Sequence, residues 1–269
     1  MRAVGQVVLA VAVFSVAVVG RVTDVDITAA SLPLNSDVVS VLPLRDKPVG
    51  IAHPVVVTFN GPVANRAAAE HAMGITSSTP AMTGKYEWPE DNVMQWVPDR
   101  FWPAHSTVKL SVGNTPVEFQ TGPALIGVAS ISQHTFTVSY EGVWKGASSG
   151  IPAPHHLPHL GEEGVLPASM GRPEYPTPVG TYSVLSKERS VVMDSSSVGV
   201  PVTDPDGYLL TVDDAVRFTN RGLFVHSAPW AVPAMGVENV SHGCISLSPA
   251  AAEWYFNNVN IGDPIIVQE

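Results

Sequence analysis

The sequence predicts a mostly β protein made of two consecutive β domains. Its 269 residues suffice for one large domain or two moderate ones, each with its own core. Hydrophobic residues make up 45% of the chain and charged residues only 14%, while 24 prolines and 22 glycines supply frequent turns. Long helices would need more Lys, Glu and Leu, so the short apolar runs between these turns are expected to be strands.

The first twenty residues have the pattern of an export signal. Arg2 is followed by an uncharged apolar run over 7–19, as in the hydrophobic region of a signal peptide. This run is short for a membrane span, but Ala3 and Val4 extend it, so an uncleaved N-terminal anchor is the alternative. We therefore expect residues 1–20 to be either a signal peptide or an anchor.

Residues 21–122 are expected to form a small antiparallel sandwich. Their short β-like runs, separated by Pro, Gly and Asn, include 55–59, 108–112 and 117–120. One helical patch is predicted over 65–73, because it contains three consecutive alanines. Trp88, Trp96 and Trp102 are interpreted as core residues rather than as a sugar-stacking surface.

Residues 123–269 are expected to form a second β domain that ends in one short helix and a last strand. Strands are predicted at 135–140, 180–185, 191–193 and 223–225. Ser248 is a suitable N-cap and Pro249 suits the first helical position, so a helix is expected through residue 257. A final strand is predicted over 265–268.

Residues 145–167 are interpreted as one long loop, because the stretch is rich in Gly, Pro and Ser and shows no periodicity. Loops of this length often act as lids over functional sites. His155, His156 and His159 lie in it. The prolines exclude a helix, and no carboxylate or Cys completes the set, so a solvated loop is favoured over a zinc or copper site.

The charge balance argues against one class of partner. The formal net charge is -10 and no basic run occurs, so a nucleic-acid partner is not expected.

The lone cysteine is the first candidate for chemistry. Cys244 is the only cysteine in the chain, so it has no internal disulfide partner, and in an exported protein an idle thiol is exposed to oxidants. A buried, purely apolar cysteine is the alternative. Its neighbours decide between the two interpretations.

Two histidines lie close to this cysteine in the sequence. Because a thiol is mostly protonated at neutral pH, a nucleophilic Cys needs a nearby base. His242 is separated from Cys244 by the turn at Gly243, whereas His226 ends a predicted strand that can lie beside the cysteine, so we assign His226 as the base. Gly243 has no Cβ, which lets a substrate carbonyl approach the nearby backbone N–H groups. A zinc site is not favoured, since no fourth ligand is evident.

Several motifs together resemble the YkuD-type L,D-transpeptidases, in particular their mycobacterial branch. These are Ser241-His242-Gly243-Cys244, Met170-Gly171, the 177–182 segment Thr-Pro-Val-Gly-Thr-Tyr, the 193–196 segment Met-Asp-Ser-Ser and the 226–230 segment His-Ser-Ala-Pro-Trp. The resemblance covers residues 123–269. Residues 21–122 resemble, by position and strand content, the immunoglobulin-like module that precedes the catalytic domain. The implied fold is an Ig-like β-sandwich followed by a YkuD-type β-sandwich with a short C-terminal helix.

The resemblance implies a role for each catalytic residue. Cys244 is the nucleophile, His226 is the general base and acid, and the main-chain carbonyl of Ser227 orients the imidazole. His242 lines the acyl pocket. The N–H groups of Gly243 and Cys244 form the oxyanion site.

The resemblance also implies the substrate-binding residues. Tyr208 places its hydroxyl near the oxyanion, and Met193 and Trp230 belong to the pocket. Two positions depart from the family pattern: Ser246 stands where Asn is usual, and Arg221 stands near the pocket where a small polar residue is common.

The implied reaction is the formation of 3→3 cross-links between peptidoglycan stem peptides, through a cysteine thioester and with release of D-alanine. No cofactor and no metal are implied, and carbapenem β-lactams are expected to be covalent inhibitors. We expect a monomer exported to the periplasm or cell wall, touching a membrane only through a possible N-terminal anchor. The Ig-like module would hold the catalytic domain away from the membrane.

Two other functions remain open at this point. In an L,D-carboxypeptidase, water would accept the acyl group in place of a second stem. In a non-catalytic wall-binding protein, the site would have decayed, although the intact Ser241-His242-Gly243-Cys244 segment argues against this.

Overall fold

The computed structural model describes residues 38–269, except positions 46, 142, 146–149 and 153–163. The predicted signal or anchor at 1–20 lies outside the described residues. Among the helices of this part of the chain, none is both long enough and apolar enough to cross a membrane.

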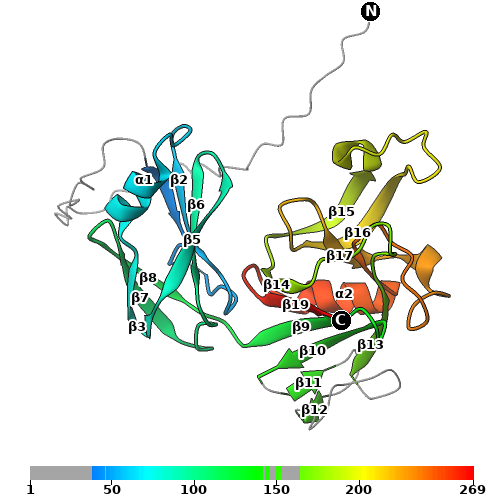
Figure 1. Cartoon of the computed structure of the whole chain (residues 1–269). Helices are drawn as coiled ribbons and strands as arrows, with labels where there is room; N and C mark the ends of the chain where they lie inside the picture. The colour runs from blue at the N-terminus through cyan, green and yellow to red at the C-terminus, as the bar shows by residue number, and fades with distance from the viewer. Residues whose placement is uncertain (1–37, 46, 142, 146–149, 153–163) are drawn as a thin grey trace, which may run out of the picture. The chain divides into compact units, whose positions relative to one another are not determined.

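Two four-stranded antiparallel sheets form the first domain (Figure 1). The first sheet has the order β1-β2-β6-β5, with bounds Val38–Leu42, Val55–Phe59, Val93–Pro98 and Gly84–Glu90. The second has the order β4-β3-β7-β8, with bounds Ala81–Met82, Thr76–Thr79, Thr107–Val112 and Thr115–Gln120. The expected antiparallel sandwich is confirmed.

The helix and the tryptophans of this domain also match the sequence prediction. Helix α1 spans Arg66–Met73, and the Asn65 side chain caps it by accepting from the Ala68 N–H at 3.0 Å. Trp96 and Trp102 are buried with ring centroids 6.0 Å apart, and Trp88 packs against the same core. The interpretation of the tryptophans as core residues is confirmed.

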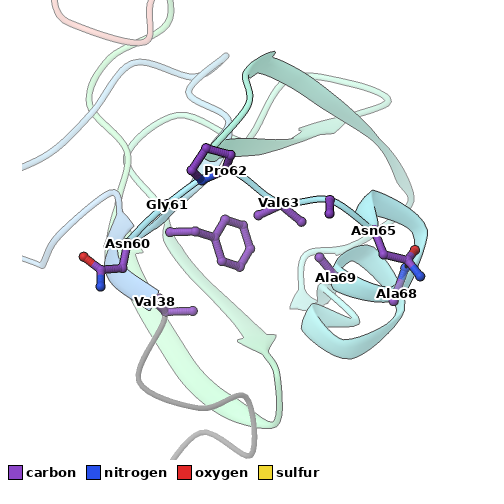
Figure 2. Close-up of a pocket in the computed structure, with 10 residues that line it drawn as sticks. Val38, Asn60, Gly61, Pro62, Val63, Asn65, Ala68 and Ala69 are labelled. Carbon is purple, nitrogen blue, oxygen red and sulfur yellow. The ribbon is translucent and has the colours of Figure 1, made fainter.

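A hollow in this domain lies beside the start of α1 and the end of β2 (Figure 2). It is lined by Val38, Phe59, Asn60, Gly61, Pro62, Val63, Ala64, Asn65, Ala68 and Ala69. None of these lining residues carries a charge, a thiol or an imidazole, so the hollow offers no nucleophile and no base.

The second domain is one sheet of eleven strands (Figure 1). Its main path runs β14-β19-β9-β10-β13-β18-β17-β16-β15, and β11 and β12 extend from β10. The bounds along this path are Gly180–Ser183, Pro264–Gln268, Leu125–Ser130, Thr135–Tyr140, Val165–Ser169, Ile245–Leu247, Phe224–Ser227, Leu209–Arg217 and Ser186–Asp194. β17 and β18 are parallel neighbours, and His226 of β17 lies opposite Ser246 of β18.

The core of this domain is covered by helix α2, Pro249–Asn258. The Ser248 side chain accepts from the Ala251 N–H, so the predicted N-cap is confirmed. Tyr255 is fully buried and packs edge-on against Phe136 of β10 at 4.9 Å. Strands from β14 to β16 along the sheet path contribute to this one core, which fixes the strands β16, β17 and β18 that carry most of the site.

The prediction of one long loop over 145–167 was wrong at both ends. β11 (Val143–Lys145) pairs with β12 (Gly150–Pro152), and β13 (Val165–Ser169) pairs with β10 and β18. Strand pairing uses backbone N–H and C=O groups. A segment such as β13 can therefore pair with β10 and β18 although its side chains do not alternate between apolar and polar. His155, His156 and His159 lie outside the described residues.

Candidate active site

The second domain has a cleft of about 200 Å³ that contains the thiol. It is lined by Met193, Tyr208, Leu210, Val212, His226, Trp230, Val240, Ser241, His242, Cys244 and Ser246. The strands β15, β16, β17 and β18 and the segment before β18 supply most of this lining. Most of the predicted site residues therefore share one accessible hollow.

The register of β17 and β18 brings His226 and Cys244 together. His226 on β17 pairs with Ser246 on β18, and Cys244 lies two residues before Ser246. Because side chains two apart on an extended chain point to the same face, His226 and Cys244 are diagonal neighbours on one face of the sheet. Both residues also line the same cleft, so the thiol and the imidazole face one space, as a cysteine nucleophile and its base do.

The imidazole of His226 is held in one tautomer. Its Nδ1 lies 2.8 Å from the main-chain carbonyl oxygen of Ser227, which can only accept, so Nδ1 carries the proton and Nε2 has the free lone pair. Burial lowers the pKa of His226, and the hydrogen bond to Ser227 only partly opposes this. His226 is thus a neutral base aimed by a backbone carbonyl. The ring of Trp230, which is 56% exposed, lies 6.1 Å from it.

Cys244 is a neutral thiol in the resting protein. It is partly buried and packs against the apolar cluster of Val212, Ala215 and Phe224. Burial raises the pKa of Cys244 to about 11, with a smaller opposing effect from a hydrogen bond to the Phe224 backbone. The thiol and the imidazole therefore do not form a charged pair at rest, and the proton must move when substrate binds.

We expect the alkylation rate of Cys244 by iodoacetamide to rise about tenfold per pH unit from about pH 7 to about pH 10, since the thiolate is the nucleophile. The thiol pKa is raised, so the neutral form persists across this range in the folded chain. Intact-mass time courses measure the rate. A rate that is already on a plateau near neutral pH would show a preformed thiolate–imidazolium pair and contradict this description. The urea-unfolded chain, with an ordinary thiol, is the control.

The segment before Cys244 is fixed by hydrogen bonds from hydroxyl groups. Gly243 has a φ of 110°, a left-handed conformation that favours glycine. The Thr177 hydroxyl donates to the Gly243 carbonyl at 2.9 Å, and the Ser241 hydroxyl donates to the Cys244 carbonyl at 2.7 Å. Thr177 also accepts from the Gly171 N–H at 2.9 Å. Gly171 and Thr177 thus help to shape the turn that presents the thiol.

One expectation for this turn needs correction. The N–H of Gly243 donates to the Ser241 hydroxyl at 3.0 Å, so it is already paired and is not a free oxyanion donor in this state. The glycine is needed chiefly for its backbone conformation, and the Ser241 hydroxyl fixes the turn, a role that the sequence motif alone did not assign. Its side chain can be recognised only from the folded turn.

The remaining predicted residues divide into two groups. Tyr208, Met193 and Ser246 line the cleft as expected. Burial raises the pKa of the Tyr208 phenol, and the nearby Cys244 is the second cause of this shift. Arg221 does not line it. It is exposed in the turn before β17, while His226 and Ser227 lie at the other end of that strand, so its expected substrate contact is not supported.

The cleft also contains apolar residues that the sequence did not single out: Leu210, Val212 and Val240. β16 alternates, so Leu210 and Val212 share a face, but this pattern alone cannot tell a core face from a cleft wall. Among the described residues, no group of three or more His, Cys, Asp and Glu is placed to hold a metal ion.

The chain matches two family models. Residues 159–267 match the L,D-transpeptidase catalytic domain, and residues 21–117 match a bacterial Ig domain. The chain is 65% identical, over 100% of both proteins, to the probable L,D-transpeptidase 3 of Mycobacterium tuberculosis.

Solved structures give the same result. The crystal structure of L,D-transpeptidase 3 from Mycobacterium tuberculosis with a faropenem-derived adduct is 69% identical, with a TM-score of 0.78, covering 87% of this chain and 98% of that chain. The structure of the transpeptidase LdtMt1 in complex with imipenem is 49% identical, with a TM-score of 0.74, covering 86% of this chain and 98% of that chain.

Proposed function

The chain belongs to the L,D-transpeptidase family of cysteine-dependent acyltransferases, and we propose that it joins peptidoglycan stem peptides by 3→3 cross-links. The observation that carries the proposal is the placement of the Cys244 thiol and the His226 imidazole on one face of adjacent strands, in an accessible cleft. A thiol beside a neutral base can attack a carbonyl carbon, and the cleft can admit an extended peptide.

In the first half of the reaction, Cys244 takes an acyl group from a tetrapeptide stem. His226 Nε2 accepts the thiol proton as Sγ attacks the carbonyl carbon of the third residue, a diamino acid. The bond to D-alanine then breaks, and His226 returns the proton to the leaving amine. The product is a thioester on Cys244 and free D-alanine.

In the second half, the amine of another stem attacks the thioester carbon. His226 Nε2 accepts a proton from this amine, the carbon–sulfur bond breaks, and the proton goes to Sγ. The thiol is regenerated and the two stems are joined by an amide. The Ser227 carbonyl stabilises the imidazolium that exists between these transfers, because Nδ1–H donates to it.

The negative charge on the attacked oxygen needs donors in the cleft. We place the Cys244 N–H and the Tyr208 hydroxyl there, with the Gly243 N–H contributing only if it leaves the Ser241 hydroxyl. Met193, Trp230, Ser246 and His242 would contact the stem from the cleft wall.

Product analysis with a disaccharide-tetrapeptide muropeptide tests the proposal. We expect mass spectrometry to find a dimer together with one D-alanine per cross-link. Tripeptide alone would show that water is the acceptor, as in an L,D-carboxypeptidase, and would overturn the cross-linking function. No turnover, with muropeptide affinity unchanged in Cys244→Ala, would support a non-catalytic binder instead.

The other assignments follow from the same family membership. The family acts in the cell wall, and we propose that residues 1–20 direct export to the periplasm or wall, with domains at 21–122 and 123–269. We also propose that carbapenems acylate Cys244, since relatives have been solved with imipenem and with a faropenem-derived adduct. The chain is proposed to act as a monomer without a cofactor.

A further inference from the structure

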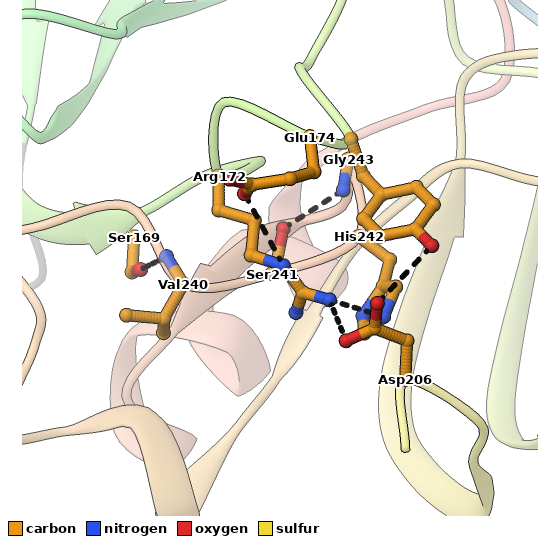
Figure 3. A network of polar contacts seen from close by, with 9 residues as sticks. Ser169, Arg172, Glu174, Asp206, Val240, Ser241, His242 and Gly243 are labelled. Atoms are coloured by element: carbon orange, nitrogen blue, oxygen red, sulfur yellow. Dashed lines mark hydrogen bonds and ion pairs between the residues drawn. The ribbon is translucent and has the colours of Figure 1, made fainter. Parts of the chain in front are cut away.

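A network of charged and aromatic side chains lies next to the cleft, with Arg172 at its centre (Figure 3). The guanidinium of Arg172 donates to Asp206 Oδ1 at 2.5 Å, and the same Nη2 lies 3.2 Å from Nε2 of His242. Its Nε lies 3.6 Å from a carboxylate oxygen of Glu174. The Arg172 side chain is 24% exposed and the Asp206 side chain is 46% exposed, so this pair is only partly shielded from water.

Arg172, His242 and Asp206 come from three separate segments of the chain. Arg172 follows Gly171, and its N–H donates to the Ser241 carbonyl at 3.0 Å, so it is anchored to the cysteine segment. His242 lies in that segment, two residues before the nucleophile. Asp206 belongs to the loop between the short 3₁₀ helix η1 (Ser195–Val198) and β16. Arg172 therefore ties this loop to the segment that carries the thiol.

The loop that contains Asp206 also contains a residue of the cleft. Tyr208 lies two residues after Asp206 and lines the cleft together with Cys244. Tyr175 also reaches this loop, because its hydroxyl donates to Asp206 Oδ2 at 3.4 Å. The remaining hydrogen bonds described for the 199–208 loop join it to η1 or to itself. Residues 201–205 are exposed. The contacts at Asp206 thus connect an otherwise exposed loop to the catalytic segment.

His242 is fixed by the same network. Its ring lies 4.7 Å from the ring of Tyr175 and 4.9 Å from that of Tyr208. Because a guanidinium can only donate, Nε2 of His242 must accept from Arg172, which leaves the proton on Nδ1. Burial, followed by the charge of Arg172, lowers the pKa of His242 against the opposing effect of Asp206. With its free lone pair engaged, His242 serves as a packing partner for Tyr208 rather than as a base.

We propose that Arg172 is a positioning residue that holds Tyr208 over the cleft through Asp206 and His242, and thereby sets the rate at which Cys244 is acylated. This inference rests on the proposed function, because acylation of Cys244 is the step that it serves. Arg172 and Asp206 do not line the cleft, so their effect should fall on the rate and not on substrate affinity.

Acylation kinetics with imipenem, followed by intact mass, test the proposal. We expect Arg172→Met and Asp206→Asn each to lower the saturating acylation rate by about tenfold, with little change in the half-saturating concentration. The double variant should be no slower than either single variant, because each substitution removes the same contact between Arg172 and Asp206. Arg172→Lys should recover part of the rate, since an ammonium group can still pair with Asp206.

A matched charge pair on the same domain is the control. Arg189 donates to Asp214 at 2.7 Å, and neither residue lines the cleft. Arg189→Met and Asp214→Asn should acylate at the parent rate. Equal losses in the two pairs would show a general loss of stability and overturn the positioning role. Asp206→Asn preserves side-chain size, so it tests the contact between Arg172 and Asp206 even if Arg172→Met folds poorly.

Amide hydrogen exchange provides a readout that needs no substrate. Exchange over 199–208 should be faster in Arg172→Met and Asp206→Asn than in the parent, and unchanged in the Arg189 and Asp214 variants. Parent-like exchange and acylation in both network variants would overturn the inference. If the parent itself reacts neither with imipenem nor with muropeptide, the proposed function fails, and the exchange result still decides whether Arg172 holds the loop.

Discussion

Replacing Cys244 with alanine is expected to abolish acylation by imipenem and the formation of cross-linked product. The chain contains no other cysteine, so no second thiol can replace it. Loss of an essential nucleophile costs on the order of 10⁶-fold in rate in a well-studied serine protease, and a comparable loss here would be below detection. Intact-mass spectrometry should show one adduct on the parent protein and none on Cys244→Ala.

The same experiment needs evidence that the variant is folded. Cys244 packs against Val212, Ala215 and Phe224, so alanine leaves a small void at the edge of this cluster. We expect a small drop in melting temperature and an unchanged far-ultraviolet circular dichroism spectrum. Cys244→Ser, which retains a polar atom of similar size, should be equally inactive. An imipenem adduct on a folded Cys244→Ala protein would show that another residue is acylated and would remove the basis of the proposed function.

Replacing His226 with alanine is expected to lower the acylation rate by roughly 10² to 10⁴-fold, the range for loss of a general base. The thiol has a pKa of about 11, so few molecules carry a thiolate at neutral pH, and without the imidazole no neighbouring base accepts the thiol proton during attack. The residual rate in His226→Ala should therefore rise with pH, in proportion to the thiolate. Rapid-mixing measurements across pH provide both the size and the pH dependence of the loss.

Two further variants separate the role of His226 as a base from its role in packing. His226→Gln fills most of the space but cannot take up the thiol proton, so it should be as slow as His226→Ala. Added imidazole should accelerate His226→Ala, because the buried ring leaves a cavity of its own shape beside the cleft. His71→Gln, on the exposed face of α1 in the first domain, should retain the parent rate. A loss of less than about threefold in His226→Ala would contradict the assignment, since general bases contribute far more.

The neutral state of the Cys244–His226 pair has a consequence for selectivity. A thiol with a raised pKa reacts slowly with simple electrophiles, whereas a bound substrate can align its carbonyl with Sγ as Nε2 removes the proton. The neutral thiol should for the same reason react slowly with oxidants until a peptide is bound.

The sequence by itself predicted the fold class, both α-helices and several of the strands, and it supplied the assignment of Cys244 and His226 that the proposed function uses. Period-two alternation predicted β10, and the cap at Ser248 with Pro249 predicted α2, because these signals arise from local backbone and side-chain geometry. Local signals could not reveal that Val165–Ser169 is a strand, since its partners, β10 and β18, are distant in the sequence. The family resemblance, and no local signal, placed Arg221 near the pocket, whereas Arg221 is not among the residues that line the cleft.

Only the tertiary structure decided how the residues around the thiol act. The parallel pairing of β17 with β18 puts His226 on the same face as Cys244, and no sequence spacing contains that register. The hydroxyl of Ser241 pairs with the Gly243 N–H, and Arg172 meets Asp206 across a distance of 34 residues, because the turn and the loop fold against each other. Sequence records which groups are available, but hydrogen bonds between distant segments depend on the packed strands that bring those groups within reach.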